Sequence, residues 1–290
     1  MITALLDFLN TRLLIEILIG FVLYVAWSLR TNLTKIADVL FEKLENPTIP
    51  EKHENGIVYL YQYRSCAKSP NSSPYCLKVE TFLKYHKIPY LPVYSASVKS
   101  RDGLLPFIIY NGKEISDSQP IISFLEKEFN LTPKLDEKEM AIARAVERTI
   151  DNSIANAMSY ILILKDPNVF FDTLLKLMPL VIAQLMFGRV YYRVKDRLEG
   201  IYFAQLPEED IFKGLDLDLK AVNEILGDKK YLFGDEPTPA DFALFGQLSI
   251  GIYCYTSVPF KTVINKYPKL EKFTENIFKD LFPHYWRNMN

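Results

Sequence analysis

Hydrophobic and polar positions between residues 57 and 129 follow two patterns in turn, one typical of strands and one typical of helices. Short apolar, β-branched and aromatic runs predict strands, and apolar positions at helical spacing predict amphipathic helices. The expected strands lie at 57–63, 90–94, 104–110 and 114–116, and the expected helices begin near Pro74 and Ser118. Asn111 and Gly112 form a hairpin turn signal between the last two strands. This alternation of strands and helices predicts an α/β unit.

The second half of the chain shows helical spacing and no comparable strand pattern. Further helices are expected at 170–198 and 208–226, and the segment 242–255 is apolar nearly all round, which predicts a helix buried on every side. Before them, the stretch 136–165 is expected to form the first helix, because one apolar face recurs in it every three or four residues, at Ile142, Val146, Ile150, Ile154, Ala157 and Ile161.

The N-terminus contains an apolar segment, 13–29, whose one charged residue is Glu16. Because a membrane-spanning helix needs about 17–25 apolar residues, the segment predicts a hydrophobic anchor helix within 1–30, followed by a connector at 31–56. An amphipathic or buried helix is an alternative, since Glu16 is costly near the bilayer centre. A cleaved signal peptide is another, because Ala26 and Ser28 have the small-residue spacing of a cleavage site. Basic residues are more numerous after the segment, which favours a cytosolic body.

Charge and cysteine content narrow the classes of function. The 34 basic and 35 acidic residues give a net charge of −1, which predicts no broad field for nucleic acid. Three cysteines form no disulfide framework, although a pair between Cys66 and Cys76 stays open. The three histidines lie apart from one another and from the cysteines, so the sequence predicts no metal site.

Several stretches of the chain resemble glutathione transferases. Residues 57–129 follow the course of their N-terminal domain, and KYLFGDEPTPADFALFGQL at 230–248 resembles a recognisable stretch of their helical domain. In its apolar N-terminus and in the segment PYCLKVETFL at 74–83, the chain resembles the failed axon connections group, which includes nematode cadmium-responsive proteins and is related to the metaxins. The resemblance implies a thioredoxin-like α/β domain at 57–130 and an all-α domain at 136–290.

The resemblance also assigns four positions to glutathione binding. Pro106 matches the cis-proline of the family, and the backbone of Leu105 before it would pair with the cysteinyl part of glutathione. Asp117 and Ser118 match the pair that holds the γ-glutamyl group at a helix N-terminus. The alternatives are a trans proline at a strand start and a simple N-cap at Ser118.

Three residues are candidates for chemistry at the glutathione sulfur. Ser73 takes the first position of a C-P-x-C motif, where a serine could hydrogen-bond the thiol but could not form a mixed disulfide. Cys76 takes the last position, although a cysteine inside a helix is more often a small buried hydrophobe. Tyr63, at the end of the first strand, is a second hydroxyl donor. The alternative for Ser73 is again an N-cap.

Thr238 and Asp241 form the strongest local signal in the helical half. A threonine followed three residues later by an acid, with proline between them, predicts a capping box at the start of the buried helix. The role expected for both residues is structural.

Two functions of different class follow. One is a membrane-anchored binding or scaffold protein, for which the resemblance implies axon development or a cadmium and stress response. The other is an active glutathione transferase or peroxidase with a serine-type site. Glutathione is the expected ligand or substrate, without a metal. The expected partners are a membrane, through 13–29, and a second copy or another protein, but no nucleic acid.

Overall fold

The computed structural model describes residues 21 and 50 and the segments 52–66, 68–95, 98–175 and 180–289. The predicted anchor segment 13–29, apart from Phe21, and most of the connector 31–56 lie outside these residues. Of the described helices, none is long and apolar enough to cross a bilayer.

The N-terminal half forms the predicted α/β domain. A four-stranded sheet has the order β2-β1-β3-β4, in which β1 pairs in parallel with β2 and antiparallel with β3, and β3 pairs antiparallel with β4. The third strand is shorter than predicted, because residues 104–106 stand outside the ladder. The elements are β1 (Val58–Gln62), α2 (Pro74–Tyr85), β2 (Tyr90–Tyr94), β3 (Phe107–Tyr110), β4 (Lys113–Ser116) and α3 (Ser118–Glu128).

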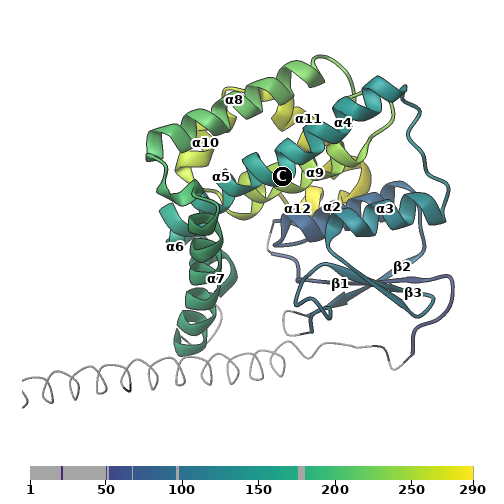
Figure 1. Cartoon of the computed structure of the whole chain (residues 1–290), viewed down its shortest axis with the longest axis horizontal. Coiled ribbons are helices and arrows are strands. Elements are labelled where there is room, and N and C mark those ends of the chain that lie inside the picture. The colour runs from purple at the N-terminus through teal and green to yellow at the C-terminus, as the bar shows by residue number, and fades with distance from the viewer. Residues whose placement is uncertain are drawn as a thin grey trace, which may run out of the picture.

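Helices α2 and α3 cover the face of the sheet that is turned toward the rest of the molecule (Figure 1). Strand residues Val58, Leu60 and Ile108 pack there against Phe82 of α2 and Ile122 of α3, and all five side chains are buried. The two helices therefore form a layer between the sheet and the helical half, and the N-terminal ends of both helices lie close to that half.

The second half is helical, as predicted. Its elements are α4 (Glu137–Thr149), α5 (Ala155–Ser159), α6 (Pro167–Phe170), α7 (Leu180–Gly200), α8 (Glu208–Leu226), α9 (Pro239–Ser249), α10 (Val258–Ile264), α11 (Pro268–Leu281) and α12 (Pro283–Met289). Wider π-helical turns continue several of these helices, at Ile150–Ile154, Tyr160–Lys165, Phe171–Leu175 and Ile250–Cys254.

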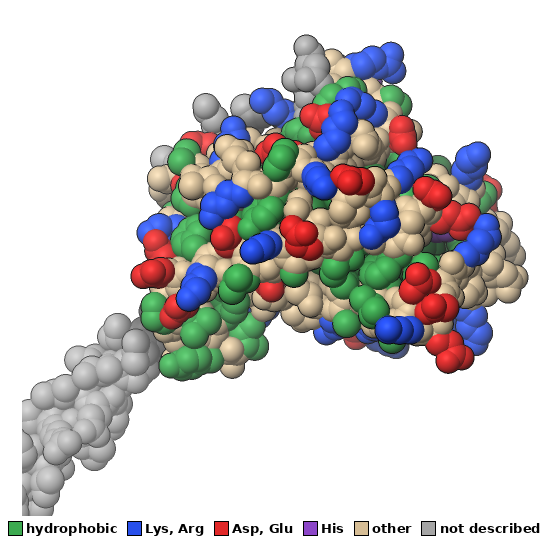
Figure 2. Space-filling view, turned by 90° about the horizontal axis from the view of Figure 1, so that it is seen from above, with side chains coloured by type: hydrophobic (Ala, Val, Ile, Leu, Met, Phe, Trp, Pro, Cys, Tyr) green, Lys and Arg blue, Asp and Glu red, His purple; other side chains and the backbone are tan. Residues whose placement is uncertain are grey.

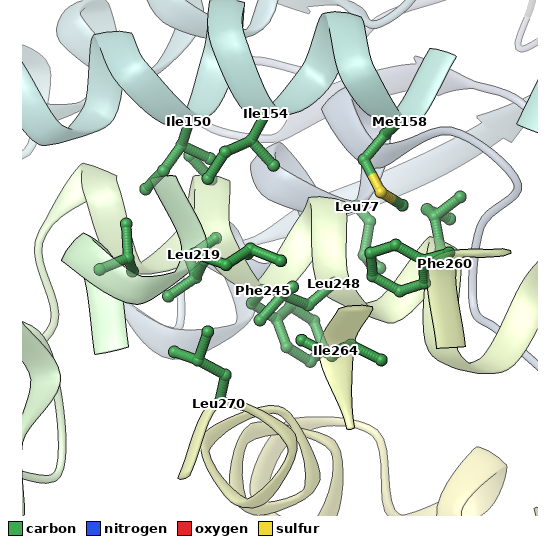
Figure 3. Close-up of a cluster of buried hydrophobic side chains, with 14 of the residues drawn as sticks. Leu77, Ile150, Ile154, Met158, Leu219, Phe245, Leu248, Phe260, Ile264 and Leu270 are labelled. Atoms are coloured by element: carbon green, nitrogen blue, oxygen red, sulfur yellow. The ribbon is translucent and has the colours of Figure 1, made fainter. Parts of the chain in front are cut away.

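Helix α9 lies at the centre of the helical core. Its residues 240–249 are all buried, which confirms the prediction of a helix enclosed on every side. Figure 3 shows Phe245 and Leu248 of α9 among the apolar side chains of the surrounding helices. The apolar face predicted for the first helix is buried from Val146 onward, but Ile142 is 42% exposed and Ala143 takes the buried position instead. Both residues lie about one helical turn before Val146, so the spacing alone could not decide which of them is buried.

Two features join the domains. Gly246 of α9 lies directly against α2, because an added Cβ would come within 2.5 Å of the Pro74 carbonyl oxygen. Lys78 of α2 is 1% exposed, and its ammonium contacts Glu147 at 2.9 Å and Asp151 at 2.6 Å in the helical domain. On the outer surface, by contrast, acidic and basic side chains are interspersed across the face that Figure 2 shows.

Candidate functional site

Two neighbouring cavities lie where the N-terminal ends of α2 and α3 meet the helical domain. The first, of about 500 Å³, is lined by Leu105, Pro106, Asp117 and Ser118 together with residues of α4, and we call it the strand-edge cavity. The second, of about 370 Å³, is lined by Tyr63, Ser73 and mostly apolar residues of the helical domain, and we call it the apolar cavity. Residues that line both cavities are Tyr75, Leu105 and Arg197.

Leu105 and Pro106 form one edge of the strand-edge cavity. The peptide bond between them is cis, as the resemblance predicted. The carbonyl of Pro106 accepts a hydrogen bond from the amide of Asp117 at 3.2 Å, which holds the start of α3 beside this edge. Within the described segments, the amide and carbonyl of Leu105 take part in no hydrogen bond. Leu105 therefore offers a free strand edge to a ligand.

Asp117 takes the N-cap position that the sequence suggested for Ser118. The N-cap of α3 is Asp117, not Ser118, and the Asp117 carboxylate accepts hydrogen bonds from the amide of Gln119 at 3.2 Å and the hydroxyl of Ser118 at 3.4 Å. Ser118 is the first helical residue and is buried. Asp117 has a φ of 71°, an unusual value for a residue other than glycine, and such positions cluster at ligand sites.

Charges of both signs line the strand-edge cavity. Arg148 and Arg197 are the basic members, and Asp117 and Asp151 are the acidic ones. One carboxylate oxygen of Asp151 contacts Lys78, whereas its Oδ1 atom is buried without a partner within the described residues. Burial raises the pKa of Asp151 despite the opposing attraction of Lys78. This mixture suits a ligand that carries both an ammonium and carboxylate groups.

Ser73 lies at the N-terminus of α2 and lines the apolar cavity. Its amide donates to Oδ1 of Asn71 at 2.9 Å, and Nδ2 of Asn71 donates to the carbonyl of Tyr63 at 2.7 Å, so Asn71 fixes the loop before the helix. The Ser73 hydroxyl accepts from the amide of Cys76 at 3.5 Å, which makes it the predicted N-cap through a long hydrogen bond. Tyr63 also lines this cavity, and its hydroxyl accepts a hydrogen bond from Nζ of Lys99 at 3.2 Å.

The cysteines do not support a redox role for Cys76. Cys76 is fully buried and lines neither cavity, and burial raises its thiol pKa to about 12. All three cysteines are free, so the disulfide left open between Cys66 and Cys76 is not formed. Cys66 instead hydrogen-bonds Cys254, and this bond is the main cause of the lowered pKa of Cys66.

Thr238 and Asp241 form the predicted capping box, away from both cavities. One carboxylate oxygen of Asp241 accepts from the Thr238 amide at 2.8 Å and the Thr238 hydroxyl at 2.9 Å, and the other accepts from the amide of Leu232 at 2.7 Å. Burial raises the pKa of Asp241 to about 6 against these hydrogen bonds. A wider groove of about 720 Å³ between α3 and α4 reaches Thr238 but none of the residues predicted for glutathione or its sulfur.

The described residues contain no group of three or more His, Cys, Asp or Glu side chains that could hold a metal ion. The polar groups that line the two cavities are hydroxyl groups, backbone groups and charged side chains.

Comparison with known proteins agrees with this architecture. Residues 74–168 match the family model of the glutathione S-transferase N-terminal domain, and residues 215–277 match that of the glutathione S-transferase C-terminal domain. The chain belongs to the glutathione transferase superfamily. It is 34% identical over 214 residues to failed axon connections of Drosophila melanogaster, a match that covers 68% of this chain and only half of that protein. It is 24% identical over 213 residues to metaxin-2 of Mus musculus, and this match covers 71% of this chain and 81% of the metaxin.

The solved structures extend the likeness to the fold. A glutathione transferase family member from Pseudomonas fluorescens pf-5, with two glutathione bound, aligns with a TM-score of 0.52. The alignment covers 82% of this chain and 94% of that chain at 13% identity, so it shows the shared fold alone.

Several residues of the two cavities were missed by sequence reasoning. Arg148 and Asp151 lie one turn apart on the helical segment that faces α3, and Arg193 and Arg197 lie one turn apart on α7. Gln247 reaches the apolar cavity from the buried helix α9. The i, i+3 and i, i+4 spacings of the charged residues were the one signal available, but such spacings are common on solvated faces.

Proposed function

We propose that this protein binds glutathione in the strand-edge cavity and acts as a membrane-tethered binding protein. The observation that carries the proposal is the free backbone of Leu105, beside a cis proline and facing the N-terminus of α3. The family membership and the glutathione molecules bound to the Pseudomonas fluorescens structure support the choice of ligand.

The chemistry of glutathione matches the groups that line this cavity. The backbone of Leu105 would pair with the cysteinyl residue, and the N-terminus of α3 at Ser118 would receive the γ-glutamyl carboxylate, because free amides and the helix dipole favour an anion there. Asp117 and Asp151 would face the ammonium group, and Arg148 the second carboxylate.

Conjugation of glutathione is the second candidate, and one observation favours it. Ser73 lies at the N-terminus of α2, beside the cavity wall formed by Leu105 and Tyr75, so its hydroxyl is placed near a thiol held at Leu105. A helix N-terminus favours a thiolate by about 0.3–1 kcal/mol at exposed sites, and a hydrogen bond from Ser73 would have to supply more. Because the family's first cysteine is absent, we place binding before catalysis.

The test combines calorimetric titration of glutathione with a conjugation assay on the full chain, using the wild type, Ser118→Ala and Ser73→Ala. If the protein binds glutathione as proposed, Ser118→Ala should weaken the affinity for glutathione about tenfold, because a hydrogen bond to a charged group is lost. Ser73→Ala should leave this affinity within twofold of the wild type. If the wild type conjugates glutathione and Ser73→Ala does not, the protein is an enzyme. Turnover that survives Ser73→Ala would point to Tyr63 as the hydroxyl donor, and a wild type without affinity for glutathione would refute the proposal.

The membrane tether rests on the composition of 13–29. The full chain should pellet with membranes and resist carbonate extraction, and its folded body should be on the cytosolic side and accessible there to added protease. Release by carbonate would exclude a spanning helix. Axon development and a cadmium or stress response, which the resemblance implied, stay predictions for this chain, as does a homodimer or a protein partner.

A further inference from the structure

The loop between β1 and α2 is held in place from both domains. Within the loop, the amide of Cys66 donates to the carbonyl of Ser69 at 3.1 Å, and the amide of Ser69 donates back to the carbonyl of Cys66 at 3.3 Å. From the helical domain, the hydroxyl of Tyr255 donates to the carbonyl of Ser72 at 3.2 Å. The two domains therefore meet along this loop through a defined contact.

Two free thiols lie together at this contact. Cys66 comes from the loop, and Cys254 is the residue before Tyr255 in the helical domain. They are 8% and 6% exposed, they belong to the same apolar cluster, and their side chains are hydrogen-bonded to each other. A disulfide requires the two sulfur atoms to approach from hydrogen-bonding distance to about 2.05 Å. The pair is thus close to the arrangement that a disulfide between the domains needs.

The two thiols differ in their readiness to ionise. The hydrogen bond that Cys254 donates is the main cause of the lowered pKa of Cys66; burial opposes it, and the backbone at Lys68 and Ser69 adds to it. Burial raises the pKa of Cys254 well above its usual range. Because the thiolate is the form of cysteine that reacts with peroxides, Cys66 is the thiol suited to react first, and Cys254 stays protonated beside it.

We infer that Cys66 and Cys254 are a redox modification site, at which a hydroperoxide produces a disulfide between the two domains. The Cys66 thiolate would attack one oxygen of hydrogen peroxide and become a sulfenic acid, and the released hydroxide would take up the proton that Cys66 had lost. The sulfur of Cys254 would then attack the sulfur of Cys66, and the sulfenic oxygen would leave with the Cys254 proton as water. The two thiols lose two electrons and the peroxide gains them.

The disulfide would fix the loop that ends at Ser73 against the helical domain. Neither cysteine lines the strand-edge cavity or the apolar cavity, so oxidation should leave glutathione affinity unchanged. The inference therefore goes beyond the proposed function and does not depend on it. Disulfides in a reducing compartment are transient, so a thiol reductant should return the pair to its free state.

The experiment is peptide mass spectrometry of the reduced full chain before and after exposure to hydrogen peroxide, with free thiols alkylated under denaturing conditions. We expect a peptide pair joined through Cys66 and Cys254, a chain lighter by two hydrogen atoms, and Cys76 recovered as the alkylated thiol. Dithiothreitol should remove the link. The oxidised chain should melt about 5 °C above the reduced chain, because a crosslink between distant residues restricts the unfolded state.

Single variants separate the two roles. In Cys254→Ser, Cys66 should stay a sulfenic acid that dimedone captures, whereas in Cys66→Ser the same peroxide treatment should leave Cys254 unmodified. Cys76→Ala is the matched control and should form the link like the wild type. Absence of the linked peptides, a disulfide between two copies of the chain, or oxidation of Cys254 in Cys66→Ser would overturn the inference. Glutathione titration of the reduced wild type keeps this outcome separate from failure of the proposed function.

Discussion

Removal of the Lys78 ammonium should strongly destabilise the contact between the two domains. Lys78 is 1% exposed, and the carboxylates of Glu147 and Asp151 that it contacts are each 7% exposed. Replacement by methionine keeps an unbranched side chain but removes the buried cation from both acids. Among the described residues, Glu147 then keeps an ion pair with Arg144, whose side chain is 56% exposed, and Asp151 keeps only the attraction of Arg148. Breaking a buried ion pair on one side costs about 3–5 kcal/mol, so we expect Lys78→Met to lower the free energy of unfolding by that amount at pH 7.5.

The pH dependence of this loss identifies its cause. In the wild type, burial opposes ionisation of Glu147, but Lys78 and Arg144 still hold its pKa below the ordinary value. Without Lys78, the pKa values of both acids in the folded state should rise above those in the unfolded state. The penalty is then full at high pH, where the acids are ionised, and falls as the pH drops through the raised values.

The assay is urea denaturation of the wild type and Lys78→Met at pH 7.5 and pH 5. The matched control is Lys134→Met, whose pair with Glu236 joins side chains that are 82% and 56% exposed, and it should leave stability unchanged. A loss for Lys78→Met below about 1 kcal/mol, or an equal loss at both pH values, would refute the reasoning.

Three further predictions concern packing, capping and thiol reactivity. Gly246→Ala should lower the free energy of unfolding by about 1–3 kcal/mol, because the added Cβ would clash with α2. Gly214→Ala should raise it by about 0.5–1 kcal/mol, because Gly214 lies on a helix and its added Cβ would meet nothing within 4 Å. Opposite shifts of the urea midpoint in the two variants would confirm both expectations. Asp241→Ala removes a buried carboxylate that accepts three hydrogen bonds, so it should lower the free energy of unfolding, measured by thermal denaturation, by about 3 kcal/mol. Glutathione affinity should be unchanged, and an unaltered melting temperature would argue against the capping box. Iodoacetamide should modify Cys66 before Cys76, since the pKa of the first thiol is lowered and that of the second is raised to about 12, and peptide mass spectrometry that finds the reverse order would contradict this.

The order of strands and helices was predictable because it depends on local patterns. Proline at the start of α2, the hairpin turn before β4 and the all-round apolar character of α9 each report on their own segment. Errors arose where two neighbouring residues satisfied the same rule. Asp117 and Ser118 are both good N-caps, and the structure selects Asp117 because the amide of Asp117 is held by Pro106 across the sheet edge.

The candidate site was predictable only in its N-terminal half. Leu105, Pro106 and Ser118 lie in motifs that the resemblance identified, and they do line one cavity. The opposite wall comes from α4 and α7, whose contribution depends on how the two domains pack, so Arg148 and Arg193 looked like ordinary residues of solvated helix faces. For Cys76 the sequence left two roles open, and the structure favours the buried hydrophobe, because the side chain is fully buried.

A crystal structure of the full chain grown with glutathione tests the central claim most directly. The account predicts glutathione in the strand-edge cavity, with its cysteinyl backbone paired to Leu105, its γ-glutamyl carboxylate at Ser118 and its sulfur directed toward Ser73. Glutathione bound elsewhere, or a strand-edge cavity that stays empty at saturating glutathione, would contradict it.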